Sequence, residues 1–314
     1  MERVEPTPEL FTNPVARYVA ATRPPFLLAA VVPVVIGWAV AYAGPGLHPG
    51  WALATLAGIL FIAAGVNVLN DYYDALNGTD GLNRDRVFPF TGGSRFIQNG
   101  VMAPEEMRNY GLALFAAGIL VGLGLAAARG GSLVLLGMAG MLLGWGYSAP
   151  PLKLNGRGLG EIAVGTGFGV FIPLGTVFVQ SGHWDPAVLR AAGSFAFLVT
   201  SMLYVNEFPD READRQAGKW HWVVRLGAER AVWGYPLLFG AAYLQDLVWI
   251  LRGDLPLWCL AGLLTLPLNL WAFRDLRRHP RQPRQLVGAI QATIAATMLH
   301  GLLMAMGIVA GGWR

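Results

Sequence analysis

The sequence contains little charge and almost no cysteine. Only 13% of its 314 residues are charged and 54% are hydrophobic, whereas a soluble globular chain carries about 25% charged residues. The single cysteine, Cys259, excludes an internal disulfide and is interpreted as a small buried apolar residue. The net charge of +4 accompanies no basic helix suited to reading bases, so nucleic-acid binding is not expected.

Long apolar runs take the place of the missing charge. They are about 20 residues long, the length of a membrane-spanning helix, rather than the ten-residue alternating segments of a barrel. Because lipid cannot satisfy backbone hydrogen bonds, runs of this length must be helical. We therefore predict an all-α polytopic membrane protein, a single domain over residues 1–314, with nine transmembrane helices. The predicted spans lie near residues 26–43, 51–75, 107–127, 132–149, 158–181, 187–207, 229–251, 254–273 and 285–309.

Lysine and arginine are distributed unevenly between the two sides of these spans. With the N-terminus inside, the outer side holds only four of the 23 basic residues, Arg129, Arg190, Arg252 and Arg314. The positive-inside rule therefore predicts that the N-terminus and the long charged loops are cytoplasmic, with the protein in the cell inner membrane. The polar stretch before Phe26 lacks the pattern of a secretory signal and is interpreted as a cytoplasmic lead-in.

Two acidic clusters end the second and sixth spans, on the same side of the membrane. Each begins with asparagine and places two aspartates on the same helix face, because the spacings are i, i+4, i+7 and i, i+4, i+8. The residues are Asn67, Asp71 and Asp74 in the first cluster and Asn206, Asp210 and Asp214 in the second. The Asn and the first Asp of the two clusters are each 139 residues apart. This recurrence predicts two similar halves, about residues 15–150 and 151–310.

Together the two clusters predict a metal site. Four carboxylates facing one cavity repel each other strongly unless cations neutralise them. Oxygen ligands without a nearby His or Cys favour Mg²⁺, which commonly bridges carboxylates to phosphate oxygens, so a diphosphate is the expected ligand. For each aspartate taken alone, solvation at a helix end remains the alternative. Asp80 is a further candidate for the first cluster.

Basic and small residues surround both clusters. A cation near a departing diphosphate would stabilise its developing charge, although each of these cations also suits an anchor at the membrane boundary. The basic candidates are Arg84, Arg86, Arg95, Lys153, Arg157, Lys219 and Arg225. Gly92 and Gly93 in TGGSRFIQNG offer exposed backbone N–H groups for a phosphate, or form part of a lid. Pro209, inside the second cluster, is predicted to bend or break its helix.

The two acidic segments, NVLNDYYDALNGTD and NEFPDREADRQAGK, resemble those of the UbiA superfamily of intramembrane prenyltransferases. The segments GGSRFIQNG and YSAPPLKLNGRGLGE and the pattern GKxxxVVRLG are most similar to those of the 1,4-dihydroxy-2-naphthoate polyprenyltransferases. The resemblance covers residues 15–310 and is most specific in the two acidic motifs and their loops.

This resemblance implies a nine-helix bundle that opens laterally to lipid and is capped on its cytoplasmic side. Two Mg²⁺ ions would be held by Asn67, Asp71, Asp74, Asn206, Asp210 and Asp214. The four aspartates, Lys153 and Lys219 would be catalytic. The implied substrate contacts are Asn67, Asn70, Asn206, Arg84, Arg95, Tyr147, Arg157 and Arg225.

The implied reaction is Mg²⁺-dependent transfer of a prenyl group from a polyprenyl diphosphate to an aromatic quinone precursor such as 1,4-dihydroxy-2-naphthoate. The sequence departs from the family near the acceptor side, at Pro209 and in WHWVV after Lys219, where Thr-Leu is commoner; His221 in this segment is a candidate acceptor contact. A membrane terpene cyclase acting on the diphosphate alone is one alternative. A secondary transporter is another, although its ionisable groups would lie near the midplane rather than at one surface.

Overall fold

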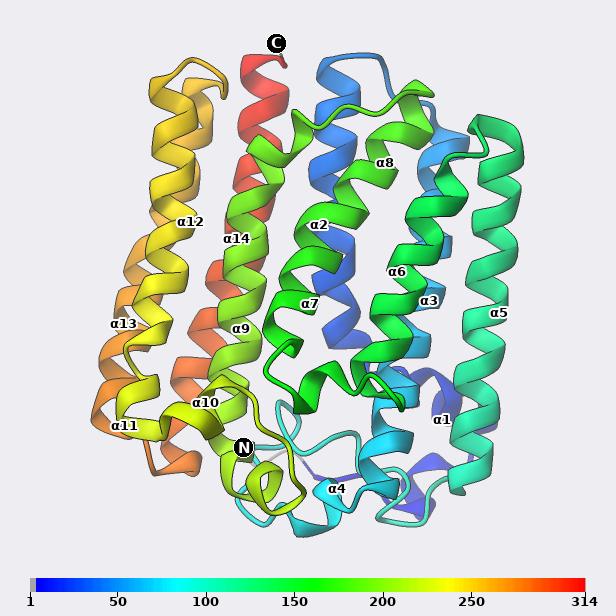
Figure 1. Ribbon diagram of the computed structural model, residues 1–314, viewed down its shortest axis with the longest axis vertical. Helices are drawn as coiled ribbons and strands as arrows, with labels where there is room; N and C mark the ends of the chain where they lie inside the picture. Colours follow the sequence, from blue (N-terminus) through cyan, green and yellow to red (C-terminus); the bar gives the residue numbers. More distant parts are fainter. Residues whose placement is uncertain (1–3, 314) are drawn as a thin grey trace.

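The computed structural model describes residues 4–313, in which every regular element is a helix and no strand occurs. Long helices run side by side as a bundle, and the shorter helices gather at the end from which the chain starts (Figure 1). The single long helices are α2 (Pro24–Ala43), α3 (Pro49–Leu76), α5 (Pro104–Arg129), α6 (Leu133–Ser148), α9 (Val188–Gln216) and α12 (Gly234–Leu251). Three further rods are built from consecutive helical segments: α7 (Gly160–Thr166), η3 (Gly167–Phe171) and α8 (Ile172–Ser181); η4 (Leu257–Thr265) and α13 (Leu266–Arg278); and η5 (Pro283–Leu286) and α14 (Val287–Gly311). The short ones are η1 (Pro8–Phe11), α1 (Pro14–Ala21), α4 (Thr79–Leu82), η2 (Leu154–Gly156), α10 (Trp222–Leu226) and α11 (Ala228–Ala231).

The predicted all-α membrane fold is confirmed, and each predicted span coincides with a helix or a helical rod of consecutive segments. Within residues 4–313, seven helices are long and apolar enough to cross a membrane. Helix α6, with 16 residues, is shorter, and α12, with 18, does not belong to the seven. The count of nine spans therefore stays a prediction.

The ends of the helices follow from local sequence. Proline occupies the first turn of α2, α3 and α5, where its missing N–H leaves no hydrogen bond unmade. Before α1, Asn13 caps the helix by accepting hydrogen bonds from the N–H groups of Val15 and Ala16. Of the bend or break predicted at Pro209, the break does not occur, because α9 continues through Pro209 to Gln216. A proline costs a helix one hydrogen bond, and the helices packed around α9 hold it in place.

The fifth span contains an irregular turn. Helix α7 passes into α8 through the π-helical turn η3, and such turns are frequent at functional sites. Gly169 in this turn lies so close to α9 that a Cβ there would stand 2.1 Å from the Cβ of Ala196. The absence of a side chain at Gly169 therefore allows the two elements to touch, which fixes one wall of the cavity described below.

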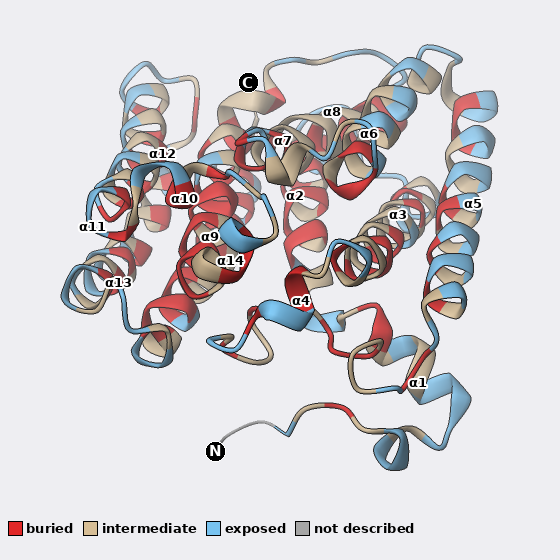
Figure 2. Cartoon of the chain, turned by 60° about the horizontal axis from the view of Figure 1, so that its bottom comes forward, coloured by how far each residue is buried: buried red, intermediate tan, exposed pale blue. Residues whose placement is uncertain are grey.

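The core is divided into three apolar clusters. One lies among α9, α12, α13 and α14, the second among α2, α8, α9 and α14, and the third joins α3 and α5 to the N-terminal segment and the loop after α4. Viewed from the end that carries the short helices, buried residues face the interior and α5 exposes much of its outer surface (Figure 2). Helix α9 belongs to two of these clusters, so the second acidic motif stands on a firmly packed element.

The two ends of the bundle differ in polarity. Both acidic motifs lie at the end with the short helices, because α3 and α9 each finish there (Figure 1). Arg129, Arg190 and Arg252 lie at the opposite end, in the last turn of α5, the first turn of α9 and the cap of α12. Arg314, which was also predicted on that side, lies outside the described residues.

Candidate active site

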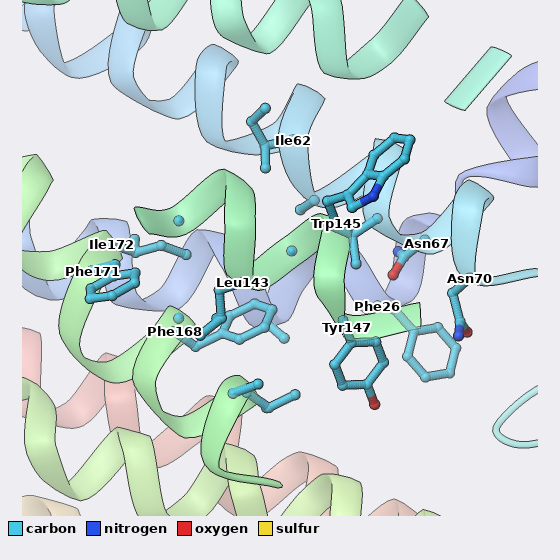
Figure 3. A pocket seen from close by; sticks show the side chains of 18 of the residues that line it. Phe26, Ile62, Asn67, Asn70, Leu143, Trp145, Tyr147, Phe168, Phe171 and Ile172 are labelled. Carbon is cyan, nitrogen blue, oxygen red and sulfur yellow. The ribbon is translucent and has the colours of Figure 1, made fainter. Parts of the chain in front are cut away.

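A cavity of about 1130 Å³ occupies one half of the bundle and reaches the polar end. Its walls come from α2, α3, α5, α6, the α7–η3–α8 rod and α9. Phe168, Phe171 and Ile172 lie toward one end, and Asn67, Asn70 and Tyr147 toward the other (Figure 3). The cavity thus joins a long apolar compartment to a polar head.

The first acidic motif occupies the last three turns of α3. Asn67, Asn70 and Asp74 line the cavity, and the amide of Asn70 donates hydrogen bonds to Asp74 Oδ2 at 3.2 Å and Ser148 Oγ at 2.8 Å. Asp71 is buried beside the cavity, where its Oδ1 accepts a hydrogen bond from the N–H of Ser94 at 3.2 Å. The predicted helix face is therefore present, with Asp71 turned toward the loop that covers it.

The second motif occupies the last three turns of α9, and its residues Asn206, Asp210 and Asp214 all line the same cavity. Asp210 Oδ1 accepts from the amide of Asn83 at 2.6 Å, and its Oδ2 accepts from the N–H of Gly92 at 3.3 Å. The two motifs, 139 residues apart in the chain, thus face each other across one polar head.

Lys219 joins the two motifs directly. Its Nζ lies 2.8 Å from Asp74 Oδ1 and 3.3 Å from Asp214 Oδ1, with only 11% of the side chain exposed. Burial alone would lower the pKa of Lys219, but the carboxylates of Asp74 and Asp214 hold it above its ordinary value. The ammonium group is therefore charged, and it is the cation that binds both halves of the site.

The turn after α9 explains why Lys219 points inward. The N–H of Lys219 donates to the carbonyl of Asp214 at 2.8 Å, and the N–H of Gly218 donates to the carbonyl of Arg215 at 3.2 Å. This is the Schellman pattern, which needs a left-handed residue, and Gly218 supplies it with φ +80°. Glycine thus turns the chain back toward the cavity immediately before the lysine.

The segment from Thr91 to Arg95 closes the polar head. Gly92 and Gly93 have φ of +80° and +73°, and a Cβ at Gly93 would stand 2.6 Å from Asp80 Oδ2 and 3.1 Å from Asp71 Oδ1. Only glycine lets the backbone approach these carboxylates so closely. The loop therefore lies over the acidic motifs, and its predicted part as a lid or a phosphate-contacting element stays a prediction.

Asp80 and Arg95 support this loop. Asp80 lines the cavity and is 3% exposed, and burial, with the neighbouring Asp74 and Asp71 charges, raises its pKa to about 8. Arg95 donates to the carbonyl of Asp80 and is buried away from the cavity lining, and burial lowers its pKa. Arg95 thus acts on the site through the loop.

The other basic candidates do not reach the cavity. Arg84, Lys153, Arg157 and Arg225 are exposed and do not line it. Arg157 donates to the carbonyl of Pro151, and Arg225 donates to the carbonyls of Trp220 and Arg157. The two arginines therefore tie the loop before α7 to the loop before α10.

Several residues at the site were not predicted as site residues. Arg23, at the start of α2, lines the cavity with its Nη1 3.7 Å from Asp71 Oδ1. Glu207 lines it beside Asn206, and its neighbour in space, Glu161, is fully buried at the start of α7. His221, which the sequence analysis names as a candidate acceptor contact, lines it too, with Nε2 3.2 Å from Asp214 Oδ2. Glu207 belongs to the second acidic segment and His221 to the WHWVV segment after Lys219. Nothing in the sequence, in contrast, places Arg23 and Glu161 near the motifs.

The charges at the polar head favour a cation. Asp74, Asp80, Glu207, Asp210 and Asp214 all line the cavity, and buried carboxylates in such proximity need positive partners. Two oxygens of the acidic motifs, Asp71 Oδ2 and Asn206 Oδ1, are buried and have no hydrogen-bond partner within residues 4–313. Oxygen donors without nearby sulfur suit a hard divalent cation.

Fold and site define a class of helical membrane proteins in which an apolar cavity ends in a head of paired acidic motifs. The chain belongs to the UbiA prenyltransferase family, whose sequence model matches residues 30–290. It is 32% identical to the 1,4-dihydroxy-2-naphthoate octaprenyltransferase of Mycobacterium tuberculosis, over 94% of this chain and 98% of that protein. It is 28% identical to the 2-carboxy-1,4-naphthoquinone phytyltransferase of Synechocystis sp., over 96% and 95%.

Solved structures share the fold. A UbiA homolog from Archaeoglobus fulgidus bound to DMAPP and Mg²⁺ matches with a TM-score of 0.58 at 17% identity, covering 92% of this chain and 99% of that one. The apo structure of a UbiA homolog from Aeropyrum pernix K1 matches with a TM-score of 0.63 at 16% identity, covering 90% and 97%. The resemblance drawn from the acidic motifs is confirmed.

Proposed function

We propose that the protein transfers a prenyl group from a polyprenyl diphosphate to an aromatic acceptor of the 1,4-dihydroxy-2-naphthoate type. The observation that carries this proposal is the single cavity that joins an apolar compartment to two facing acidic motifs bridged by Lys219. A prenyl diphosphate has the same division, an apolar chain attached to a charged head. The names of the relatives over nearly the whole chain support the acceptor class.

The polar head fits Mg²⁺. The residues that would hold the ions are Asn67, Asp71, Asp74, Asn206, Asp210 and Asp214, and the unpartnered buried oxygens of Asp71 and Asn206 are suitable donors. When bound, Mg²⁺ supplies charge that neutralises the diphosphate and holds it against the carboxylates. Binding and release of the diphosphate require the loop around Gly92 to adjust, because Asp210 and Asp71 accept hydrogen bonds from its backbone.

The chain's own residues then assist the chemistry. The bond between C1 of the allylic chain and the diphosphate oxygen breaks, with both electrons going to the diphosphate. The charged groups of Lys219 and Arg23 lie where they stabilise that leaving group. A ring carbon of the acceptor forms the new bond to C1 and then loses its proton to a base, for which Asp74 on the cavity wall and the carboxylate of the acceptor itself are the candidates. The apolar walls exclude water, which would otherwise capture the cation.

We also propose the orientation and internal organisation of the chain. The end with the acidic motifs would face the cytoplasm of a cell inner membrane, since Arg129, Arg190 and Arg252 lie at the opposite end and most other cations lie at the end that carries the acidic motifs. The two halves, residues 15–150 and 151–310, would be related repeats within one domain. In support, the motifs end the two long helices α3 and α9, of 28 and 29 residues.

The test is product formation by the purified protein in Mg²⁺-containing detergent or lipid nanodiscs. The protein is supplied with a polyprenyl diphosphate, with and without 1,4-dihydroxy-2-naphthoate, and the products are identified by mass spectrometry. Prenylated naphthoate-derived product that is lost in Asp71→Ala and Asp210→Ala but kept in Glu106→Gln supports the proposal. Cyclised hydrocarbon from the diphosphate alone would replace it with a terpene cyclase, and near-normal turnover in both aspartate variants would refute the proposed metal site.

A further inference from the structure

Three buried ionisable side chains meet beside the acidic motifs, where no part of the proposed diphosphate chemistry uses them. They are Glu161 at the start of α7, Glu207 on α9 and His221 just before α10, with exposures of 0%, 8% and 2%. One ligand atom from each lies within 4.8 Å of the other two. Three segments far apart in the chain thus converge on one point.

Each of these side chains has one buried polar atom that makes no hydrogen bond in the part of the chain that the structure describes. These atoms are Glu161 Oε2, Glu207 Oε2 and His221 Nδ1. His221 Nδ1 lies 3.2 Å from Glu207 Oε2, an ion pair when the imidazole is protonated, whereas Glu161 Oε2 has neither a hydrogen bond nor an ion pair within residues 4–313. A fully buried carboxylate oxygen without a donor is costly, so a cation between these atoms would remove a real deficit.

The second polar atom of Glu161 and of His221 is held by a residue outside this group of three. Glu161 Oε1 accepts a hydrogen bond from the N–H of Trp222 at 2.7 Å. His221 Nε2 lies 3.2 Å from Asp214 Oδ2, a contact that holds the ring with Nδ1 turned toward Glu207. A carboxylate behind a histidine and a backbone donor behind a carboxylate are the supports that orient metal ligands in proteins.

The spacing also agrees with a metal site. In a tetrahedral site with bonds of 2.0–2.1 Å, neighbouring ligand atoms are about 3.3 Å apart. His221 Nδ1 and Glu207 Oε2 are 3.2 Å apart, and the ligand atoms of all three residues lie within 4.8 Å of one another. One imidazole nitrogen with two carboxylates favours Zn²⁺ or a neighbouring first-row ion, whereas Mg²⁺ prefers oxygen ligands alone.

We propose that Glu161, Glu207 and His221 form a separate binding site for a divalent transition-metal ion, with Zn²⁺ as the reference ion. Binding requires a neutral imidazole, so one proton leaves Nδ1 for solvent. Three protein ligands leave a fourth position open, and Glu207 and His221 line the cavity. The open position therefore faces the substrate compartment, where it suits an oxygen of the acceptor; this last step rests on the proposed function.

The first experiment measures metal content without any substrate. The full-length protein, purified without metal-affinity resin, is loaded with Zn²⁺, dialysed against excess Mg²⁺ and analysed by inductively coupled plasma mass spectrometry. We expect one Zn²⁺ per chain that Mg²⁺ does not displace. Wild-type protein that keeps no Zn²⁺ under these conditions overturns the proposal, whatever the enzyme assay shows.

Matched variants locate the ion. Glu161→Gln and His221→Gln each remove one ligand, and Zn²⁺ affinity should fall at least roughly 10- to 100-fold, the loss seen when even an outer partner of a metal ligand is removed. Asp71→Asn alters the proposed Mg²⁺ site and Glu106→Gln a distant carboxylate; both should keep the Zn²⁺. The assignment of these ligands is overturned if Glu161→Gln and His221→Gln both keep the Zn²⁺, or if Asp71→Asn loses it. If one ligand variant does not fold, the other decides.

The second experiment tests the open position separately from turnover. Co²⁺ replaces Zn²⁺ at such sites and gives a visible absorption spectrum that depends on its ligands. The band should require both Glu161 and His221, and it should shift when 1,4-dihydroxy-2-naphthoate is added without a prenyl diphosphate. A Co²⁺ band that does not respond to the acceptor overturns the acceptor contact while leaving the metal site intact. Failure of the proposed reaction would instead appear as absent product with the bound ion unchanged.

Discussion

Replacing Lys219 by glutamine is the sharpest test of how the two acidic motifs act together. Its Nζ lies 2.8 Å from Asp74 and 3.3 Å from Asp214. With an effective dielectric constant of about 20, each of these pairs attracts with about 5–6 kcal/mol before the cost of desolvation is subtracted. Glutamine keeps a similar length and can donate hydrogen bonds, so Lys219→Gln removes chiefly the charge.

The expected effect on turnover is large. Losing one group that stabilises charge in the transition state costs about 10²- to 10³-fold in kcat, or about 2.7–4 kcal/mol. We therefore expect kcat of Lys219→Gln to fall by this factor with Mg²⁺ present at saturation. Lys219→Arg, which keeps the charge, should recover part of the loss. Steady-state kinetics with both substrates, followed by mass spectrometry of the product, measures these values.

Lys153→Gln is the matched control, since Lys153 is a lysine in a nearby loop. The resemblance to the family implies a catalytic role for Lys153, whereas the structure leaves it exposed and off the cavity lining. From this geometry we expect kcat to change by less than about threefold, as for a surface charge. If kcat falls equally in Lys153→Gln and Lys219→Gln, the buried lysine has no special role compared with the exposed one. A normal kcat in Lys219→Gln would refute the bridging role of Lys219.

Three further outcomes are expected. Removal of divalent ions with EDTA should abolish turnover, with activity restored by Mg²⁺; full activity after chelation would contradict the proposed carboxylate site. His300→Ala should destabilise the protein by about 2–5 kcal/mol. It leaves a cavity at a fully buried position and removes the ring nitrogens that lie 3.1 Å from Ser194 Oγ and 3.2 Å from the Gly262 carbonyl oxygen; an unchanged midpoint of thermal unfolding would contradict this role. Gly169→Ala should cost about 1–3 kcal/mol or more, because its Cβ would stand 2.1 Å from that of Ala196; an unchanged midpoint would show that η3 and α9 separate freely.

The helices could be predicted from the sequence because lipid leaves a long apolar run only one conformation. Their ends could not be placed as well. The sixth span was predicted to finish at residue 207, but α9 continues to Gln216, since the acidic motif itself is helical. The run of apolar residues stops where the charged residues begin, whereas the helical hydrogen bonds of the backbone continue to Gln216. Pro209 lies inside this helical motif, and the helix continues through it.

The acidic motifs could be predicted because each is a local pattern on one helix. Arg23 and Glu161 could not be predicted as their neighbours, because these contacts join segments distant in the chain. Arg23 lies 3.7 Å from Asp71 only because α1 and α2 begin beside the end of α3. Glu161 approaches Trp222 and His221 only because the loops before α7 and α10 pack together, with the N–H of Trp220 donating to the carbonyl of Gly156.

The two lysines show that a positive charge in a polar loop does not by itself predict whether the side chain reaches the cavity. Lys153 and Lys219 are equivalent as positive residues in polar loops, yet one is exposed and the other is buried between two carboxylates. The difference lies in the turn at Gly218, whose positive φ closes the end of α9 and directs the next residues back into the cavity. The same turn brings in His221, at the position where WHWVV replaces the commoner Thr-Leu pair. A glycine that ends a motif-bearing helix therefore indicates which following side chains reach the site, and here these side chains are Lys219 and His221.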